Sequence, residues 1–213
     1  MKNFKYYITF CLICALSSQF NNNERMGGDI VGERSEDYFG WSVSLNSNGR
    51  RIAIGAPYND DSSIDAGQTK VYEYTIDRWV QMGADIDGES SQDNFGWSVS
   101  LNSKGRRVAI GAPDNDDSGT DAGQTRVYEY SIDRWVQMGA DIDGECAQDY
   151  SGRSVSLNSS GSRVAIGSPY NDDSGTDAGQ TRVYEYIIDR WVQMGADIDG
   201  EASNDHFGWS VSL

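Results

Sequence analysis

The chain has 213 residues, enough for one or two domains with a sizeable core. It contains 33 acidic and 17 basic residues, and the resulting net charge of −16 disfavours binding to nucleic acids and to anionic membrane surfaces. Aromatic residues account for 11% of the chain, which excludes a disordered acidic tail because so many rings need a core to bury them.

Residues 1–26 have the pattern of a secretory signal peptide followed by a short leader. Lys2 and Lys5 form a basic start, residues 8–16 are apolar apart from one threonine, and small residues follow. The apolar run is too short to span a bilayer, which takes about 20 residues, so we expect no membrane insertion. We therefore predict a secreted or cell-surface protein. The alternative is that this run forms a buried first strand.

A gapless repeat of 56 residues organises the rest of the chain, residues 27–213. The copies are segments 29–84, 85–140 and 141–196, and a partial fourth copy covers 197–213. The second and third copies are identical at 46 of 56 positions, which indicates recent duplication. Identical residues at equivalent positions of the copies are therefore weak evidence that those residues are functional.

Each copy contains four runs with the pattern of β-strands, and none has the 3.6-residue apolar period of a helix. In the second copy these runs are residues 97–101, 107–112, 124–132 and 134–138, separated by turns rich in Gly, Asn and Asp. Four short strands in a repeat of about 40–50 residues indicate the antiparallel blade of a β-propeller. A stacked β-solenoid is the alternative, although its repeats are normally shorter.

Two short motifs recur at fixed spacing within the repeat. Phe39-Gly40 precedes 55–57 (GAP), and 95–96 (FG) precedes 111–113 (GAP). This pattern resembles the FG-GAP repeat, the blade unit of the integrin α-subunit propeller and of many secreted repeat proteins. The resemblance covers residues 29–213 and implies an all-β propeller with a binding or adhesion role outside the cell.

The third copy departs from this motif, because 151–153 (SGR) replaces Phe-Gly-Trp. We expect that blade to lose apolar packing where Arg153 replaces tryptophan.

Three blades plus a partial fourth form an open arc, because closed propellers usually have roughly four to eight blades. The sequence favours a fragment of a larger propeller over a complete arc. If the arc is complete, self-association through its open blade edges is expected, since unpaired strand edges can pair between chains.

Alternate loops of an up-and-down blade emerge at opposite ends, which allows the charges to be sorted. The loops between strands 2 and 3, and between strand 4 and the next strand 1, carry 26 of the 33 acidic residues. These are residues 57–67 and 85–96 with their copies in the other repeats, and we call this surface the acidic loop face. Three explanations of this acidic surface remain open: solvation of the protein, calcium binding, and direct binding of a cationic or hydroxyl-rich partner.

The calcium hypothesis depends on the loop between strands 2 and 3, which offers oxygen ligands at alternating positions. The candidate metal ligands are Asn59, Asp61 and Asp65 in the first copy, Asn115, Asp117 and Asp121 in the second, and Asn171, Asp173 and Asp177 in the third. Asp85, Asp87, Glu89 and Asp93 form a second candidate set, but its first copy has Val31 in place of one aspartate.

The metal site of the family does not carry over. Integrin-like FG-GAP blades hold calcium between strands 1 and 2, in a D-x-D-x-D-G-x-x-D pattern. Here that loop is 46–51 (NSNGRR), with no carboxylate and two adjacent cations. Calcium is the one cofactor that the sequence suggests, and it would bind elsewhere.

The aromatic residues predict packing between blades rather than a regular ligand-binding array. They include tryptophans that open the first predicted strand (Trp41, Trp97, Trp209) and the fourth (Trp79, Trp135, Trp191). Tyr58 and Tyr170, on the acidic loops, are better candidates for ligand contact. Their counterpart in the second copy is Asp114.

Catalysis is not predicted, because an active site breaks repeat symmetry and the unique groups here do not form one. His206, the single histidine, has no nucleophile placed to use it, and Cys146 stands where other copies have Ser90 and Ala202. Paired carboxylates recur in every blade, whereas glycoside hydrolysis needs two carboxyl groups in different environments.

The sequence therefore predicts a secreted or cell-surface, non-catalytic binding or adhesion module. Its working surface would be the acidic loop face, and its partner an extracellular protein or polysaccharide. Two alternatives remain open: the non-catalytic part of a secreted carbohydrate-active enzyme, and a structural surface-layer repeat.

Overall fold

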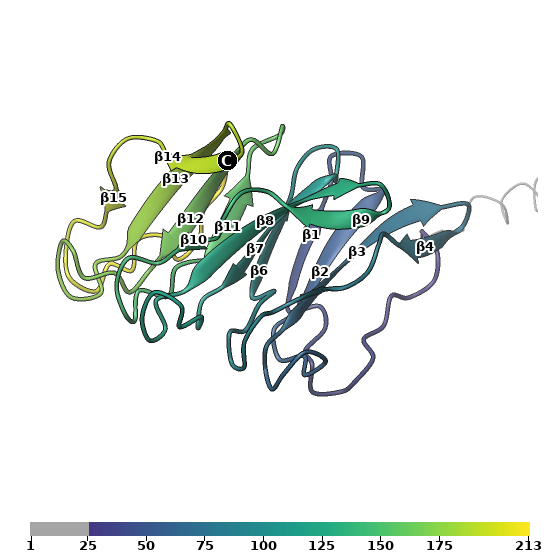
Figure 1. Ribbon diagram of the computed structural model, residues 1–213, viewed down its shortest axis with the longest axis horizontal. Coiled ribbons are helices and arrows are strands. Elements are labelled where there is room, and N and C mark those ends of the chain that lie inside the picture. Colours follow the sequence, from purple (N-terminus) through teal and green to yellow (C-terminus); the bar gives the residue numbers. More distant parts are fainter. Residues whose placement is uncertain (1–25) are drawn as a thin grey trace, which may run out of the picture.

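The computed structural model describes residues 26–213, so the predicted signal peptide and leader, apart from Met26, lie outside the described residues. These residues form three antiparallel sheets that stand side by side in an open row (Figure 1). The fold is all-β, as predicted, with propeller-type blades. Over residues 26–213, no helix has the length and apolarity needed to cross a membrane.

Each sheet corresponds to one sequence repeat. The first contains β1 (Ser42–Leu45), β2 (Arg51–Ala56), β3 (Gln68–Thr75), β4 (Arg78–Gln81) and β5 (Ile86–Asp87). The second contains β6 (Ser98–Leu101), β7 (Arg107–Ala112), β8 (Gln124–Ser131), β9 (Arg134–Gln137) and β10 (Ile142–Asp143). The third contains β11 (Ser154–Leu157), β12 (Arg163–Ser168), β13 (Gln180–Ile187), β14 (Arg190–Gln193) and β15 (Ile198–Asp199).

The four predicted strands of the second repeat are confirmed, each with ends within one residue of the prediction. The fifth strand was not predicted. β10 pairs with the start of β8, through Ile142 opposite Thr125, while β9 pairs with the end of β8. The two short strands therefore share one edge of β8, and Gly139, with φ +74°, lies between them.

The core lies between neighbouring sheets, since strands with alternating burial present an apolar face to the next blade. Ala53 and Val71 of the first sheet meet Val99, Leu101 and Ile110 of the second. An equivalent cluster fills the space between the second and third sheets. Burying one such aliphatic side chain stabilises a fold by about 1.5–3 kcal/mol, so each sheet depends on its neighbour.

Tryptophans of the fourth strands donate hydrogen bonds to the segment that follows the fourth strand of the preceding repeat. This confirms the predicted packing between blades. Trp135 Nε1 donates to the carbonyl oxygen of Met82 at 2.7 Å, and Trp191 Nε1 donates to that of Met138 at 2.7 Å. Gly83 follows Met82 with φ +74°, and a Cβ there would lie 3.3 Å from Trp135 Cδ1. Glycine is therefore needed at this position for both its backbone angle and the space that it leaves.

The hairpins between the first two strands lie at the end of the blades opposite the acidic loops. Asn46 Oδ1 accepts the Arg51 backbone N–H, and Arg51 Nη1 donates to the carbonyl oxygen of Lys104 in the next blade. Arg51 also pairs with Glu73 at 2.7 Å. These residues have structural partners, in keeping with the predicted loss of the family's metal pattern in this loop.

Candidate binding surface on the acidic loop face

Backbone hydrogen bonds hold the two kinds of acidic loop together at one end of the blades, as the sorting of charges predicted. The N–H groups of Gln92, Asn94 and Phe95 donate to carbonyl oxygens of the loop between β2 and β3, and the same pattern recurs in the following blades. Gly67 also forms an isolated parallel β-bridge with Phe95. Acidic side chains thus project from loops that are fixed to the sheets rather than hanging free.

The asparagine in each predicted calcium loop is a structural residue. Asn115 is 1% exposed, its Nδ2 donates to Asp93 Oδ2 at 3.1 Å, and its Oδ1 accepts the backbone N–H of Asp117. Asn171 makes the equivalent bonds to Asp149 and Asp173, and Asn59 makes them to Asp37 and Asp61. The amide oxygen expected to bind a cation already accepts a hydrogen bond within its own loop.

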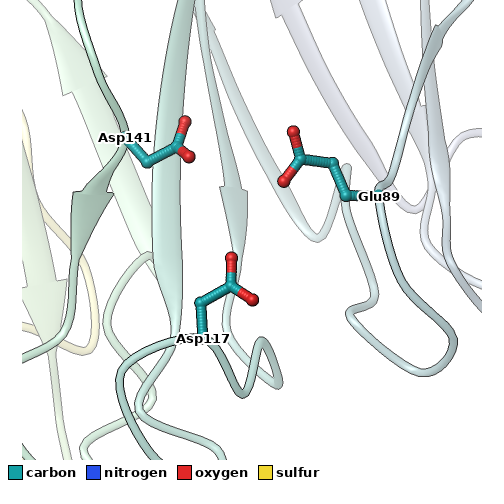
Figure 2. A group of neighbouring side chains, drawn as sticks. All are labelled: Glu89, Asp117 and Asp141. Carbon is teal, nitrogen blue, oxygen red and sulfur yellow. The ribbon is translucent and has the colours of Figure 1, made fainter.

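The middle aspartate of the second and of the third predicted set lies with acids from the neighbouring loops, whereas Asp61 of the first set pairs with Arg34 at 3.0 Å. Glu89, Asp117 and Asp141 direct their carboxylates toward a common space, each with an oxygen within 4.8 Å of the others (Figure 2). Glu145, Asp173 and Asp197 form the equivalent group. The prediction grouped residues along one loop, whereas the structure groups one acid from the loop between strands 2 and 3 with two from segments before and after it. Pairing the loops by blade position would have found this arrangement.

A buried cation accompanies each group of carboxylates. Arg126 is 3% exposed, pairs with Glu89 at 2.8 Å and stacks over the Phe95 ring at 4.2 Å. In the first blade Lys70 takes this position, 2.6 Å from Glu33 and 3.5 Å from Asp85. Burial alone would lower the pKa of Lys70, but its hydrogen bond to Glu33 and the charge of Asp85 raise it above the ordinary value. The buried cation partly neutralises the carboxylates around it.

The last aspartate of each predicted set lies elsewhere on the face. Asp121 Oδ2 accepts the hydroxyl of Tyr150 at 3.3 Å, and Asp121 itself has φ +51°. Asp177, the equivalent residue of the third blade, lines a cavity beside that tyrosine. The three residues of the second predicted set therefore make three different kinds of contact, and calcium binding by the three sets stays a prediction.

A row of stacked side chains runs across the blades just before their first strands. The rings of Trp41 and Trp97 are 4.8 Å apart, and the Arg153 guanidinium lies 4.5 Å from Trp97 and 4.7 Å from Trp209. The loss of apolar packing expected at Arg153 is thus offset in part, because the guanidinium stacks between two indoles.

The two tyrosines predicted to contact a ligand belong to aromatic clusters at either end of this row. Tyr58 lies 5.1 Å from Tyr38, and Tyr170 lies 5.2 Å from Tyr150 and 5.1 Å from His206. The Nδ1 atom of His206 is 3.2 Å from the carbonyl oxygen of Pro169. His206 is therefore a partly buried member of an aromatic cluster.

Between these clusters lies a cavity of about 510 Å³, which we call the central cavity. It is lined by Trp97, Pro113, Asp114, Gln148, Tyr150, Arg153, Tyr170 and Asp177. Burial raises the pKa of Asp114, while a hydrogen bond from Asn94 Nδ2 acts in the opposite direction. The sequence analysis singled out Tyr170 but did not predict the cavity. Two substitutions between repeats could have indicated it: Asp114 in place of tyrosine and Arg153 in place of tryptophan.

Cys146 is an exposed free thiol. The negative charge of Asp149 raises the pKa of Cys146, which disfavours the reactive thiolate.

Comparison with known proteins supports the repeat and the fold. A family model described as FG-GAP repeat matches residues 32–72 and 85–128, and no curated protein matches the chain. Among solved structures, a proposed 6-phosphogluconolactonase from Bacteroides uniformis aligns with a TM-score of 0.54 at 10% identity, over 81% of this chain and 44% of its own. This likeness concerns the fold alone.

Two further solved structures align less closely. The Cps50 (Swd1) β-propeller domain from Myceliophteria thermophila has a TM-score of 0.48 at 12% identity, over 78% of this chain and 41% of its own. Hydrazine synthase from Kuenenia stuttgartiensis has a TM-score of 0.47 at 7% identity, over 82% and 42%. The chain thus spans less than half the length of each of these three. Together with the FG and GAP motifs and the antiparallel blades, the family match shows FG-GAP repeats at residues 32–72 and 85–128.

Proposed function

We propose that the protein is a non-catalytic binding module that acts outside the cell, and that its ligand contacts the acidic loop face. The observation that carries this proposal is the gathering of 26 acidic residues on loops that hydrogen bonds fix to rigid sheets. A fixed surface loses little conformational entropy when a ligand binds, which favours recognition. The FG-GAP repeat is consistent with a binding role, whereas secretion and adhesion are part of the proposal.

The chemistry of the carboxylates supports a non-catalytic role. Burial raises the pKa of Asp93 and of Asp149, and each accepts hydrogen bonds from an asparagine and a backbone N–H. The two residues are copies of one another with the same surroundings. A pair of acids that divide the work of acid and base needs surroundings that differ.

The proposal is tested by expressing the full chain and measuring where it accumulates and what it binds. We expect the protein in the culture medium or on the cell surface, and we expect it to retain a component of an extracellular extract. Added salt should weaken this retention, because exposed charges are screened at high ionic strength. Salt-independent retention of a charged component would contradict its recognition by the exposed carboxylates of this face, and release of reducing sugar from polysaccharides would contradict the absence of catalysis.

Calcium binding on the same face is a second proposal, favoured by the carboxylates of Glu89, Asp117 and Asp141 within 4.8 Å of one another. A cation bound only by the folded protein raises the free energy of unfolding by RT ln(1 + [L]/Kd), about 2.7 kcal/mol at one hundred times Kd. We therefore expect the unfolding temperature to rise on changing from EDTA to millimolar calcium. Asp117→Asn should reduce that rise, while Asp133→Asn, on the opposite end of the blade, should not. No calcium-dependent shift in the folded protein would exclude the proposal.

A further inference from the structure

The central cavity coincides with the place where the nearly identical repeats differ. The second and third copies share 46 of 56 positions, so fewer than one position in five varies. Five of the eight lining residues come from three of the varying positions, because Trp97 and Arg153 are copies of each other, Asp114 and Tyr170 are copies of each other, and Tyr150 is the fifth. These three varying positions meet in one space, which makes this junction between blades chemically different from its neighbour.

The replacement of a ring by a carboxylate accounts for the opening of the cavity. Tyr58 and Tyr170 hold the position of Asp114 in the other blades, and their rings pack among neighbouring rings. Tyr58 lies 6.3 Å from Trp41 and 6.4 Å from Trp97, and Tyr170 lies 6.1 Å from Trp209. The side chain of Asp114 is much smaller than a phenol, so space remains beside Tyr150 and Arg153.

The lining offers both kinds of hydrogen-bonding group together with aromatic surface. Asp114 and Asp177 supply acceptors, Arg153 and Gln148 supply donors, and three rings supply apolar area. Neither sign of charge prevails strongly, because a cationic ligand meets the guanidinium and an anionic one meets two carboxylates. A neutral ligand with many hydroxyl groups can use the donors and the acceptors while its C–H surface packs on the rings. The volume lies within the range of about 300–1,000 Å³ usual for small-ligand sites.

We propose that the central cavity binds a saccharide unit, with Asp114 accepting hydroxyl hydrogen bonds and Arg153 donating to sugar oxygens. This inference rests on the proposed function, since it places ligand recognition within the acidic loop face. It adds the chemical class of the ligand and assigns recognition to one junction between blades rather than to all of them.

Asp114→Tyr is the decisive variant, because it restores the residue of the sister blades and should therefore fold. The purified full chain and the variant are applied to an array of immobilised mono- and oligosaccharides, and the saccharide bound most tightly is then titrated by calorimetry. We expect D114Y to bind it at least about tenfold more weakly, since a ring fills the cavity and a charged acceptor is lost. Arg153→Trp, which restores the residue of the other repeats, should weaken binding in the same direction.

Glu36→Tyr is the matched control. It removes the same charge and adds the same ring at an exposed position of the acidic loop face outside the cavity, and it should bind as the unmodified protein does. If D114Y, folded by circular dichroism, binds the saccharide unchanged, the cavity assignment is overturned while binding by the face stands. If the unmodified protein binds no saccharide on the array, the inference is overturned, and retention of an extracellular protein would leave the proposed function intact.

Discussion

Each blade has an interior between the sheets and an acidic loop face, and the two regions differ in how closely the residues of successive repeats match. In the interior, Trp135 and Trp191 make the same bond to the preceding blade, at 2.7 Å in both cases. On the acidic loop face, Asp114 breaks a series of tyrosines and Arg153 breaks a series of tryptophans. Packing requires that each blade fit its neighbour in the same way, whereas a binding site needs to be formed only once.

The comparison also explains why one sequence can be buried in one blade and exposed in another. Leu101 is 7% exposed, whereas its copy Leu45 is 58% exposed because no described blade precedes the first sheet. The same residue in the same repeat thus gains its stabilising contacts only from a neighbour, and this difference can be measured directly.

The largest expected effect comes from truncating that leucine. Leu101→Ala should lower the free energy of unfolding by about 2–5 kcal/mol, because it leaves a cavity in the core between the first and second sheets. Leu45→Ala removes the same atoms from an exposed position and should cost less than about 1 kcal/mol. Urea unfolding followed by tryptophan fluorescence compares the two. Equal losses would mean that the blades do not stabilise one another through this interface.

A smaller loss of stability is expected from replacing Gly83, which leaves space for the Trp135 side chain. Gly83 and Gly195 have φ of +74° and +76°, but a Cβ would lie 3.3 Å from Trp135 Cδ1 at the first and would meet nothing within 4 Å at the second. Alanine at either position costs about 1–2 kcal/mol of backbone strain. Gly83→Ala should therefore lower the thermal unfolding temperature more than Gly195→Ala, since the indole must also move. A greater loss for Gly195→Ala would contradict the packing of Trp135 on this segment.

Much of the fold followed from the sequence because its signals are local. Period-2 alternation and turn residues placed the strands of the second repeat, and regular spacing placed the loops at opposite ends. The strand Ile142–Asp143 was missed because two residues carry no periodicity and pair only through the edge of β8.

The candidate site was harder to predict because its residues come from different repeats. Asp117 is close to Asp121 in sequence, yet its carboxylate lies with Glu89 and Asp141. Arg153 suggested a loss of packing when judged alone, and only the stacking of the blades shows it between two indoles. Differences between copies, mapped onto neighbouring blades, hold more information about such a site than any single loop.

The smallest expected effect is the dependence of stability on pH, which should arise on the acidic loop face because the core between the sheets is apolar. Burial raises the pKa of Asp93, Asp114, Asp143 and Asp149 above the ordinary value of 3.8 in the folded protein. The folded state then binds more protons than the unfolded state between that value and the raised pKa values, so stability increases as pH falls through this window. One full pKa unit corresponds to about 1.4 kcal/mol. Asp143 is exposed and should contribute well below that because water screens its charge, whereas Asp93 and Asp149 are 2% and 3% exposed and should contribute most of the effect.

Urea unfolding at pH 7 and at a series of values down to pH 4 measures this dependence. We expect the free energy of unfolding to rise modestly as the pH falls through this window. Asp114→Tyr should reduce the rise, because it removes one of the four groups, whereas Leu45→Ala should leave the slope unchanged since it alters no charge. A steady fall in stability from pH 7 downward would mean that the ion pairs of the acidic loop face outweigh the cost of burying its carboxylates.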